Sequence, residues 1–385
     1  MTALRGLAKR CRTENLKLLA YDSLSKCYRE RTAEILEPLF HDSNATQTRK
    51  LFDVHPLGLG LIVQFWPRAK LTSGDKLFFS GNWWWRPEAF KEFSLLKAKN
   101  SASIYVFLHD LIPIAAPQFV DPLHTKNFIS GFVIVAKTAD VIITNSEASK
   151  KDILRHLDDL QRSNLAVKVT PLAHEFVSLP DLGFHPLHAL FQWCTSLQKY
   201  GRSQLLAKIL TAGPFVLMVG TIENRKNVPA ILKVWKRLLE RSPAHQFPQL
   251  VLVGKWGQGA PEIQSFLRQN NNIQEHVTVL ERIMDSELKR LYEHCIFTVY
   301  ISHYEGWGLP IGESLWFGKP VLASNTSAMG EVGGEGVTYV DPADESDIER
   351  GVQKMLLETE PKRKYYDYLR PESDFCDDLS DIITE

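Results

Sequence analysis

The segment FVLMVGTIENRKN, residues 215–227, decides the fold of this chain. It begins with a short, wholly apolar run, which is typical of a buried strand in a parallel sheet. Gly220 and Thr221 leave the strand, and Arg225 and Lys226 stand where the next helix begins. A helix N-terminus offers free N–H groups, and an arginine fork and a lysine charge beside it suit a diphosphate. The segment predicts a strand–loop–helix unit that binds phosphate groups, with two solvated surface cations as the plainer alternative.

A second segment, YEGWGLPIGESLWFGKPVLAS at residues 304–324, has a complementary pattern. EGWG is a glycine loop whose backbone can approach a ligand closely, and Pro310 fits the first position of a helix. Glu305 lies on the loop, and Glu313 lies in the opening turns of the helix. Either carboxylate alone has a structural explanation, since loop acids are exposed and acids are favoured near a helix N-terminus. Their combination with the glycine loop predicts a functional site.

Short β-rich apolar runs alternate with helical patterns such as Val228–Leu239 and Asp285–His294, which predicts an α/β fold with parallel sheets. The stretch from Phe176 to Gly213 breaks this rhythm and marks the join between two domains. We therefore expect two Rossmann-like domains, residues 1–205 and 206–385, with the last fifteen residues as a loose acidic tail. The predicted strands are Lys17–Tyr21, Leu61–Phe65, Lys76–Ser80, Ser103–Leu108, Val141–Thr144, Val167–Thr170, Phe215–Gly220, Gln249–Gly254, Val277–Leu280, Phe297–Ile301, Pro320–Ser324 and Val337–Val340.

The composition excludes several classes of protein. Of 385 residues, 44% are hydrophobic and 23% are charged, which is ordinary for a globular protein and excludes a disordered chain. The longest apolar run, Pro56–Trp66, is shorter than the about 20 residues that cross a bilayer, and the first residues lack the apolar core of a signal peptide. Five cysteines, far apart and without CxxC spacing, predict free thiols in a reducing compartment. We expect a cytoplasmic protein.

Charge is unevenly distributed although the net charge is zero. The first 200 residues hold 25 Lys and Arg against 19 Asp and Glu, and the remainder holds 20 against 26. A basic cluster near the N-terminus is best interpreted as a solvated basic face, with peripheral contact with a membrane surface or an anionic acceptor as the alternative. No zinc spacing or basic stripe indicates nucleic-acid binding. The cluster comprises Arg5, Lys9, Arg10, Arg12 and Lys17.

These segments resemble the family 4 retaining glycosyltransferases of the GT-B fold, the group 1 glycosyltransferases, which use nucleotide-activated sugars. Glu305 and Glu313 match that family's E-x7-E signature, and GTIENRKN resembles its G-T-x-E-x-R-K-N segment. The resemblance covers almost the whole C-terminal half, and the N-terminal half from about Gly74 onward. Further matches are HDLIP (His109–Pro113), TNSEASKKDI (Thr144–Ile153), LVGK (Leu252–Lys255) and VLERIMDSELKRLY (Val279–Tyr292).

The resemblance implies a role for each matching residue. Arg225 and Lys226 would hold the donor diphosphate and stabilise it as it leaves, and Glu305 would bind the transferred sugar. Glu313 would accept hydrogen bonds from the ribose hydroxyls. His109 would reach across a cleft between the two domains to the sugar, with a strand-end histidine as the structural alternative. The implied donor-binding residues are Gly220, Thr221, Lys255, Arg282, Ile283, Gly306, Trp307, Gly308, Leu309 and Glu313.

The resemblance also implies a reaction. HDLIP and EGWGLP resemble bacterial mannosyl- and rhamnosyltransferases of surface polysaccharides, so the implied activity is hexose transfer, with GDP-mannose as the favoured donor. The acceptor would be a glycan or a lipid-linked glycan, and transfer would proceed with retention. Neither a cofactor nor a metal ion is expected. The alternatives are a catalytically silent scaffold of the same fold, or a sugar-nucleotide epimerase or phosphorylase.

The N-terminal half departs from the family pattern in two places. Many relatives carry a glycine-rich TGIGR-like loop after the first strand, whereas here the first predicted strand runs into YDSLSKCYRE. The run NWWWRP, Asn82–Pro87, places Trp83–Trp85 after a predicted strand, where the rings would stack on a sugar, contact a lipid or pack in the core.

Overall fold

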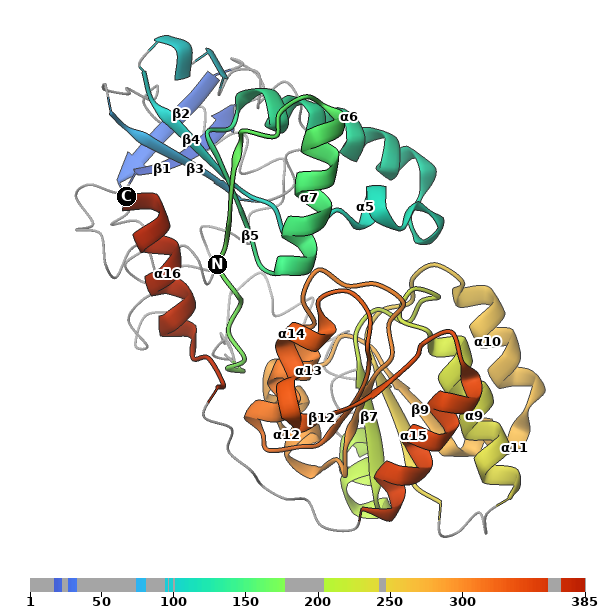
Figure 1. The fold of residues 1–385 in the computed structure, drawn as a ribbon. Helices are drawn as coiled ribbons and strands as arrows, with labels where there is room; N and C mark the ends of the chain where they lie inside the picture. The colour runs from blue at the N-terminus through green and yellow to red at the C-terminus, as the bar shows by residue number, and fades with distance from the viewer. Residues whose placement is uncertain are drawn as a thin grey trace, which may run out of the picture. The chain divides into compact units, whose positions relative to one another are not determined.

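The computed structural model in Figure 1 divides the chain into two compact units. Unit 1 contains residues 1–172 and 371–385, and unit 2 contains residues 173–370. Each has a parallel sheet with helices, which confirms the predicted α/β class. The predictions for Leu61–Phe65, Trp83–Trp85 and the basic residues Arg5 to Arg12 lie outside the described residues. The structure describes residues 17–22, 27–32, 74–80, 94–95, 97–99, 101–176, 204–241, 247–358 and 368–384.

Unit 1 is built on a four-stranded parallel sheet in the order β3-β4-β5-β6. Its core lies between this sheet and its helices, where Ile104, Val106 and Ile142 meet Phe132 and Ile153. The strands are β3 (Lys76–Ser80), β4 (Ser103–Phe107), β5 (Val141–Thr144) and β6 (Ala166–Val169), and the helices of this half of the chain are α5 (Ile112–Ala115), η4 (Pro117–Phe119), α6 (Pro122–Thr138) and α7 (Glu147–Asp159).

The first predicted strand forms, but outside the parallel sheet. β1 (Lys17–Asp22) pairs antiparallel with β2 (Cys27–Thr32), with Lys17 opposite Thr32. Only residues 23–26 join the two strands, and a parallel crossover needs a dozen residues or more. The short connection therefore imposes a hairpin, which corrects the expectation that this strand belongs to a parallel sheet. It also explains why YDSLSKCYRE has no glycine loop, since no helix follows β1 directly.

Unit 2 has a six-stranded parallel sheet in the order β12-β11-β10-β7-β8-β9. The chain starts at β7 in the middle, runs outward through β8 and β9, and then returns to begin the other half at β10. Such a reversal is a topological switch point, where open α/β sheets bind ligands beyond the carboxyl ends of the strands. The strands are β7 (Phe215–Val219), β8 (Gln249–Val253), β9 (Val277–Leu280), β10 (Thr298–Tyr300), β11 (Val321–Ser324) and β12 (Val337–Val340).

Helices cover both faces of this sheet (Figure 1). Alternate residues of β7 point to opposite faces. Val216 and Met218 join a core with α9 and α15, and Phe215 and Leu217 join a core with α12. The helices are α9 (Val228–Glu240), α10 (Ala260–Gln269), α11 (Asn271–His276), α12 (Asp285–His294), α13 (Leu309–Trp316), α14 (Met329–Gly333), η6 (Gly334–Gly336) and α15 (Glu345–Leu357).

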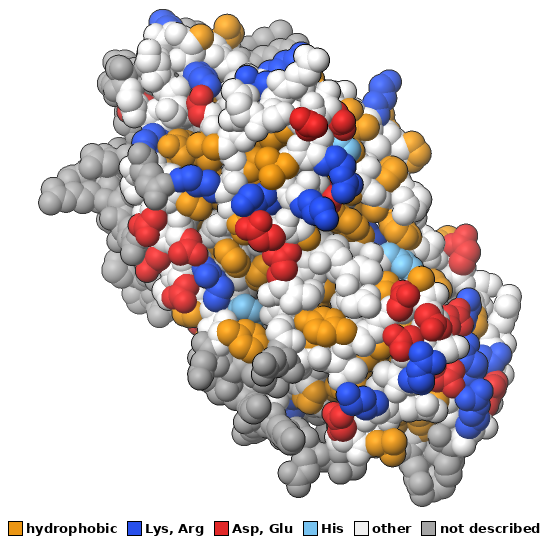
Figure 2. Space-filling view, viewed as in Figure 1, with side chains coloured by type: hydrophobic (Ala, Val, Ile, Leu, Met, Phe, Trp, Pro, Cys, Tyr) orange, Lys and Arg blue, Asp and Glu red, His pale blue; other side chains and the backbone are white. Residues whose placement is uncertain are grey.

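Ion pairs tie α9 to α15 on the surface of unit 2. Lys233 lies 2.9 Å from Glu345, and Arg237 lies 2.9 Å from Glu345 and 2.7 Å from Glu349. Figure 2 shows acidic and basic side chains interspersed on this side of the molecule. Exposed pairs of this kind contribute at most about 1 kcal/mol each, so these residues serve below as control positions.

The last fifteen residues correct the expectation of a loose tail. They contain a helix, α16 (Glu372–Thr384), whose residues Phe375, Leu379 and Ile383 pack against unit 1 at β4 and β5. These three residues recur every four positions and form one apolar face, which the acidic residues between them hide in a composition average. The chain passes from one unit to the other at residues 172/173 and 370/371, whereas the predicted boundary lay between residues 205 and 206. Among the described residues, no helix is long and apolar enough to cross a membrane.

Candidate active site

The loops after β7 and β8 approach each other so closely that only glycine fits. A Cβ atom on Gly254 would lie 1.9 Å from the carbonyl oxygen of Gly220, and Gly254 has φ +155°. The Gly220 N–H donates to the Val253 carbonyl (2.9 Å), and the Ile222 N–H donates to the Lys255 carbonyl (2.8 Å). This contact fixes the path of GTIENRKN as it leaves the sheet.

Gly254→Ala tests the importance of that contact. The methyl group has no space against backbone, so the loop after β7 must move, and we expect the variant to lose ligand binding at this site and several degrees of Tm. Gly330→Ala is the control, since a Cβ atom there meets nothing within 4 Å. Thermal unfolding of both variants checks this, and an unchanged Tm for Gly254→Ala would contradict the close approach.

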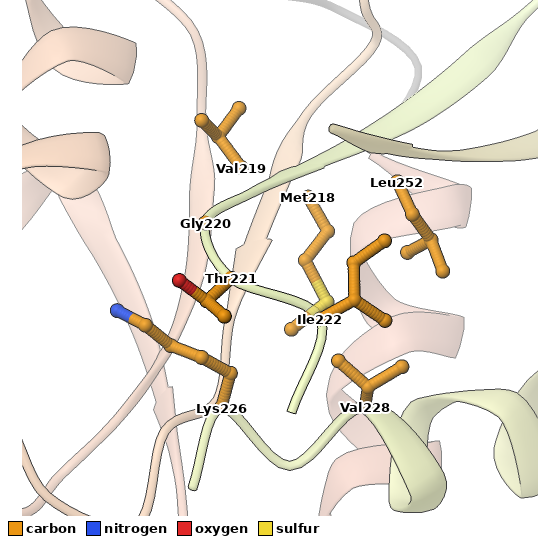
Figure 3. A pocket seen from close by; sticks show the side chains of 8 residues that line it. All are labelled: Met218, Val219, Gly220, Thr221, Ile222, Lys226, Val228 and Leu252. Carbon is orange, nitrogen blue, oxygen red and sulfur yellow. The ribbon is translucent and has the colours of Figure 1, made fainter. Parts of the chain in front are cut away.

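Lys226 lines a small pocket at this strand end (Figure 3). Figure 3 shows the Lys226 amino group and the Thr221 hydroxyl pointing to the same side, away from the apolar side chains of Met218 and Leu252. The lysine stem passes the carboxyl end of β7, where its Cε atom would lie 3.3 Å from a Cβ atom on Gly220. The residues that line the pocket are Met218, Val219, Gly220, Thr221, Ile222, Lys226, Val228 and Leu252.

Glu305 joins the two segments that the sequence singled out. Its Oε1 atom lies 2.7 Å from Arg225 Nη1 and 2.6 Å from Lys226 Nζ. Arg225 also donates from Nη2 to Glu223 (2.9 Å) and from Nη1 to the Tyr304 carbonyl (2.8 Å). The cluster therefore contains two cations and two carboxylates at the switch point between β7 and β10. The structure brings together three of the four predicted catalytic residues.

Opposite charges counteract the effect of burial on Glu305 and Lys226. Burial alone would raise the pKa of Glu305, but Lys226 and Arg225 outweigh that effect and lower the pKa below its usual value. Burial lowers the pKa of Lys226, and Glu305 opposes this. With Glu223 counted, the four formal charges sum to zero, so an anionic ligand would meet cations whose charge is already balanced.

Tyr300, the last residue of β10, contacts the ammonium group of Lys226 with its hydroxyl and its ring. The ammonium group donates to the Tyr300 hydroxyl and lies 4.4 Å from the ring centroid. Tyr300 is 3% exposed, and burial raises its pKa well above 10. Sequence reasoning missed Tyr300 and Glu223. Their signal is position, because Tyr300 ends the strand before the Glu305 loop and Glu223 lies two residues before Arg225.

Backbone bonds join the Glu305 loop to its neighbours. The His303 N–H donates to the Arg225 carbonyl (2.9 Å), and the Glu305 N–H donates to the Ser327 hydroxyl (2.9 Å). Gly308 has φ +132°, in the region that favours glycine, and the next residue begins α13. These contacts place the backbone of the Glu305 loop next to Arg225.

Glu313 lies on α13, as predicted, and has a partner that the sequence did not indicate. The Tyr292 hydroxyl donates to Glu313 Oε2 over 2.6 Å. Burial raises the pKa of Glu313, the Tyr292 bond opposes this, and the nearby Asp285 adds to it. The charges of both Glu305 and Glu313 act on Tyr300, so the two glutamates of the signature share one electrostatic neighbourhood.

His174 packs against the EGWG loop and α13. Its Nδ1 atom accepts from the Arg370 N–H (2.9 Å), so Nε2 carries the proton and donates to the Val332 carbonyl (3.0 Å). Its ring lies edge-on to Trp307 at 6.3 Å. Trp307 is 5% exposed and packs as a core side chain, so the contribution of this residue to a ligand site is its backbone.

The remaining predicted residues lie in three places. Lys255 follows β8 and pairs through its carbonyl with Ile222, while Ile283 packs in the core beside α12. Arg282 has a left-handed backbone, φ +54°, in the turn after β9. Leu309 is exposed at the start of α13.

His109 belongs to unit 1, directly after β4. Its carbonyl accepts from the Ser149 hydroxyl (3.1 Å), and its ring lies edge-on to Phe107 at 4.8 Å. The residue is exposed, yet enough protein surrounds the ring to lower its pKa below the usual value. A role toward a donor sugar stays a prediction. No group of three or more His, Cys, Asp or Glu in the described part of the chain is placed to bind a metal ion.

The unit that carries this cluster is similar to known proteins. Residues 207–370 match the family described as glycosyl transferases group 1. The serotype-specific mannosyltransferase WbdA of Escherichia coli is 25% identical over 70% of this chain and 32% of its own length. The O-antigen chain mannosyltransferase B of Escherichia coli is 31% identical over 64% of this chain and 60% of its own. The chain thus spans about a third to three fifths of the length of these relatives.

Solved structures show the fold. A UDP-forming α,α-trehalose-phosphate synthase from Burkholderia xenovorans, in complex with glucose-6-phosphate, superposes with a TM-score of 0.59 at 13% identity, over 82% of this chain and 74% of its own. This likeness confirms the predicted GT-B architecture. Over residues 207–370, this chain is therefore similar to the glycosyl transferases group 1.

Proposed function

We propose that this protein is a retaining glycosyltransferase that moves a hexose from a nucleotide sugar to a glycan or lipid-linked glycan in surface-polysaccharide synthesis. One observation carries the proposal. Arg225, Lys226 and Glu305 meet at the switch point of a parallel sheet, although Glu305 lies 80 positions after Arg225 and 79 after Lys226. Cations and a carboxylate at one buried point suit a reaction that separates charge.

The chemistry follows from those charges. The bond between the anomeric carbon and the diphosphate oxygen breaks, so negative charge grows on the diphosphate and positive charge on the sugar ring. Arg225 and Lys226 stabilise the negative charge on the diphosphate, and Glu305 stabilises the positive charge on the sugar ring. In the proposed retaining reaction the acceptor oxygen attacks on the face that the diphosphate leaves, and the acceptor proton passes to the departing phosphate oxygen. Glu313 binds the ribose.

GDP-mannose is the proposed donor. The support is the mannosyltransferase activity named for two relatives, while the UDP-forming synthase is similar in fold at 13% identity. We further propose that the reaction needs no metal ion or other cofactor, since Arg225 and Lys226 supply the positive charge that a metal ion would supply to a diphosphate. His109 is proposed to act on the sugar side.

A catalytically silent protein of the same fold is the second candidate. The observation that favours it is the β1–β2 hairpin, which stands where many family members have a strand and a glycine-rich loop. The intact charge cluster in unit 2 opposes it.

Thermal unfolding with GDP, UDP, dTDP and their sugar conjugates, in the presence of EDTA, is the first test. Ligand at about 100 times its Kd adds about 2.7 kcal/mol of stability, so we expect a clear rise in Tm with guanine nucleotides above the rest. Release of the nucleoside diphosphate in the presence of an acceptor glycan then measures turnover. Binding of no nucleotide would overturn the enzyme assignment, and binding without turnover would favour the silent protein.

A further inference from the structure

The Tyr292 hydroxyl donates across 2.6 Å to Glu313, the second glutamate of the E-x7-E pair. The residue lies on α12, 21 positions before Glu313 on α13, and its side chain is wholly buried. The bond joins two helices at the edge of the ligand site that the charge cluster marks.

The Tyr292 ring is held on two sides. It stacks on Phe317, with centroids 5.5 Å apart and planes at 14°, and Phe176 lies edge-on to it at 5.9 Å. A buried ring in such packing has little freedom to rotate. The hydroxyl therefore occupies a fixed point, and a carboxylate bonded to it is fixed with it.

Glu313 needs such a partner because its surroundings disfavour its charge. Burial and the neighbouring Asp285 raise its pKa, and Tyr292 is the group that opposes them. Burial raises the pKa of Tyr292 itself well above 10, so the phenol stays a proton donor and Glu313 the acceptor at working pH. One carboxylate oxygen is thereby committed to Tyr292, and the other is left to accept from a ligand.

We propose that Tyr292 is a positioning residue for recognition of the nucleotide ribose: its hydroxyl pins Glu313 Oε2 so that Oε1 is aimed at the ribose hydroxyls. The inference rests on the proposed function, in which Glu313 binds the ribose. It goes further by assigning part of the donor specificity to a residue that touches no ligand. Because ribose contacts do not change as the glycosidic bond breaks, the effect falls on binding and not on the chemical step.

Tyr292→Phe is the test, since it removes the hydroxyl and keeps the ring. We expect the KM for the nucleotide sugar and the Kd for GDP to rise about tenfold, with kcat within about twofold of the wild type. Calorimetry with GDP, 2′-deoxy-GDP and 3′-deoxy-GDP gives the sharper readout. The wild type should bind a deoxy analogue at least tenfold more weakly than GDP, and Tyr292→Phe should discriminate less than threefold.

Two controls separate the explanations. Tyr339→Phe removes another hydroxyl of unit 2, one that donates to backbone carbonyls of α14, and should leave discrimination unchanged. Glu313→Gln should abolish discrimination, and adding Tyr292→Phe to it should weaken GDP binding no further. Normal GDP binding with full ribose discrimination in Tyr292→Phe would overturn this inference alone. Failure of the wild type to bind either GDP or UDP would overturn the proposed function together with it.

Discussion

Replacing Glu305 with glutamine is expected to lower turnover at least a hundredfold and, at the same time, to tighten the binding of the nucleoside diphosphate. The two effects have one cause. Glu305 balances Arg225 and Lys226 in the free protein, at 2.7 and 2.6 Å. Without its charge the cluster changes from neutral to a net charge of +1, so an incoming diphosphate meets uncompensated cations. A tenfold gain in affinity corresponds to about 1.4 kcal/mol.

Turnover falls for a different reason. In the proposed reaction the sugar ring gains positive charge only as the bond breaks, so the carboxylate stabilises the transition state more than the bound donor. A hundredfold loss is about 2.7 kcal/mol. Stability also falls, because removing one partner from a buried ion pair costs about 3 kcal/mol. The Tm of the ligand-free variant should therefore drop, and GDP should restore more of it than it adds to the wild type.

The pH dependence of stability gives an independent check. The pKa of Glu305 in the folded protein lies below its usual value. Its ion pairs therefore stabilise the fold above about pH 4.5 and lose that effect as the pH falls through the lower, folded value. Glu305→Gln should remove this part of the acid sensitivity, whereas Glu345→Gln, at an exposed carboxylate on α15, should change neither turnover nor nucleotide affinity. Weaker GDP binding in Glu305→Gln would show that the carboxylate supports the diphosphate site instead of competing with it.

The sequence predicted the sheet of unit 2 well because its strands are buried on both faces. Continuous apolar runs such as Phe215–Val219, each followed by a glycine or a turn, have few alternative interpretations. The loops that leave them carry the charged residues, and the rule for parallel sheets places those residues at one edge. Arg225, Lys226 and Glu305 therefore meet as expected, although Glu305 lies 80 positions after Arg225 and 79 after Lys226.

The sequence failed where the outcome depends on tertiary partners. β1 has the composition of a sheet strand, but a connection of residues 23–26 turned it into a hairpin. The acidic composition of α16 concealed an apolar face. This face packs in unit 1, although the residues directly before the helix belong to unit 2. From the sequence, Tyr292 and Tyr300 are indistinguishable from ordinary core aromatic residues. The neighbouring sequence does not indicate which carboxylate or ammonium group a buried hydroxyl will contact.

Replacing Lys226 with methionine is expected to move nucleotide affinity in the opposite direction from Glu305→Gln. Methionine keeps an unbranched apolar side chain at the pocket that Met218, Val228 and Leu252 also line, so we expect the fold to be kept while the charge and the contact with Tyr300 are lost. The cluster becomes net negative, and a diphosphate is repelled. Turnover should fall by two to three orders of magnitude, about 3 to 4 kcal/mol.

The loss should grow with the charge of the ligand, which distinguishes a phosphate-binding lysine from a structural one. Free GDP carries about one more negative charge than a GDP-sugar, because its terminal phosphate ionises near pH 6. We therefore expect calorimetry to show about a hundredfold loss of affinity for GDP and about a tenfold loss for GDP-mannose. Lys233→Met, which removes an exposed lysine of α9, should change neither. Equal losses for the two ligands would contradict a role for Lys226 in stabilising the leaving diphosphate, since that role requires the contact to strengthen as the negative charge on the diphosphate grows.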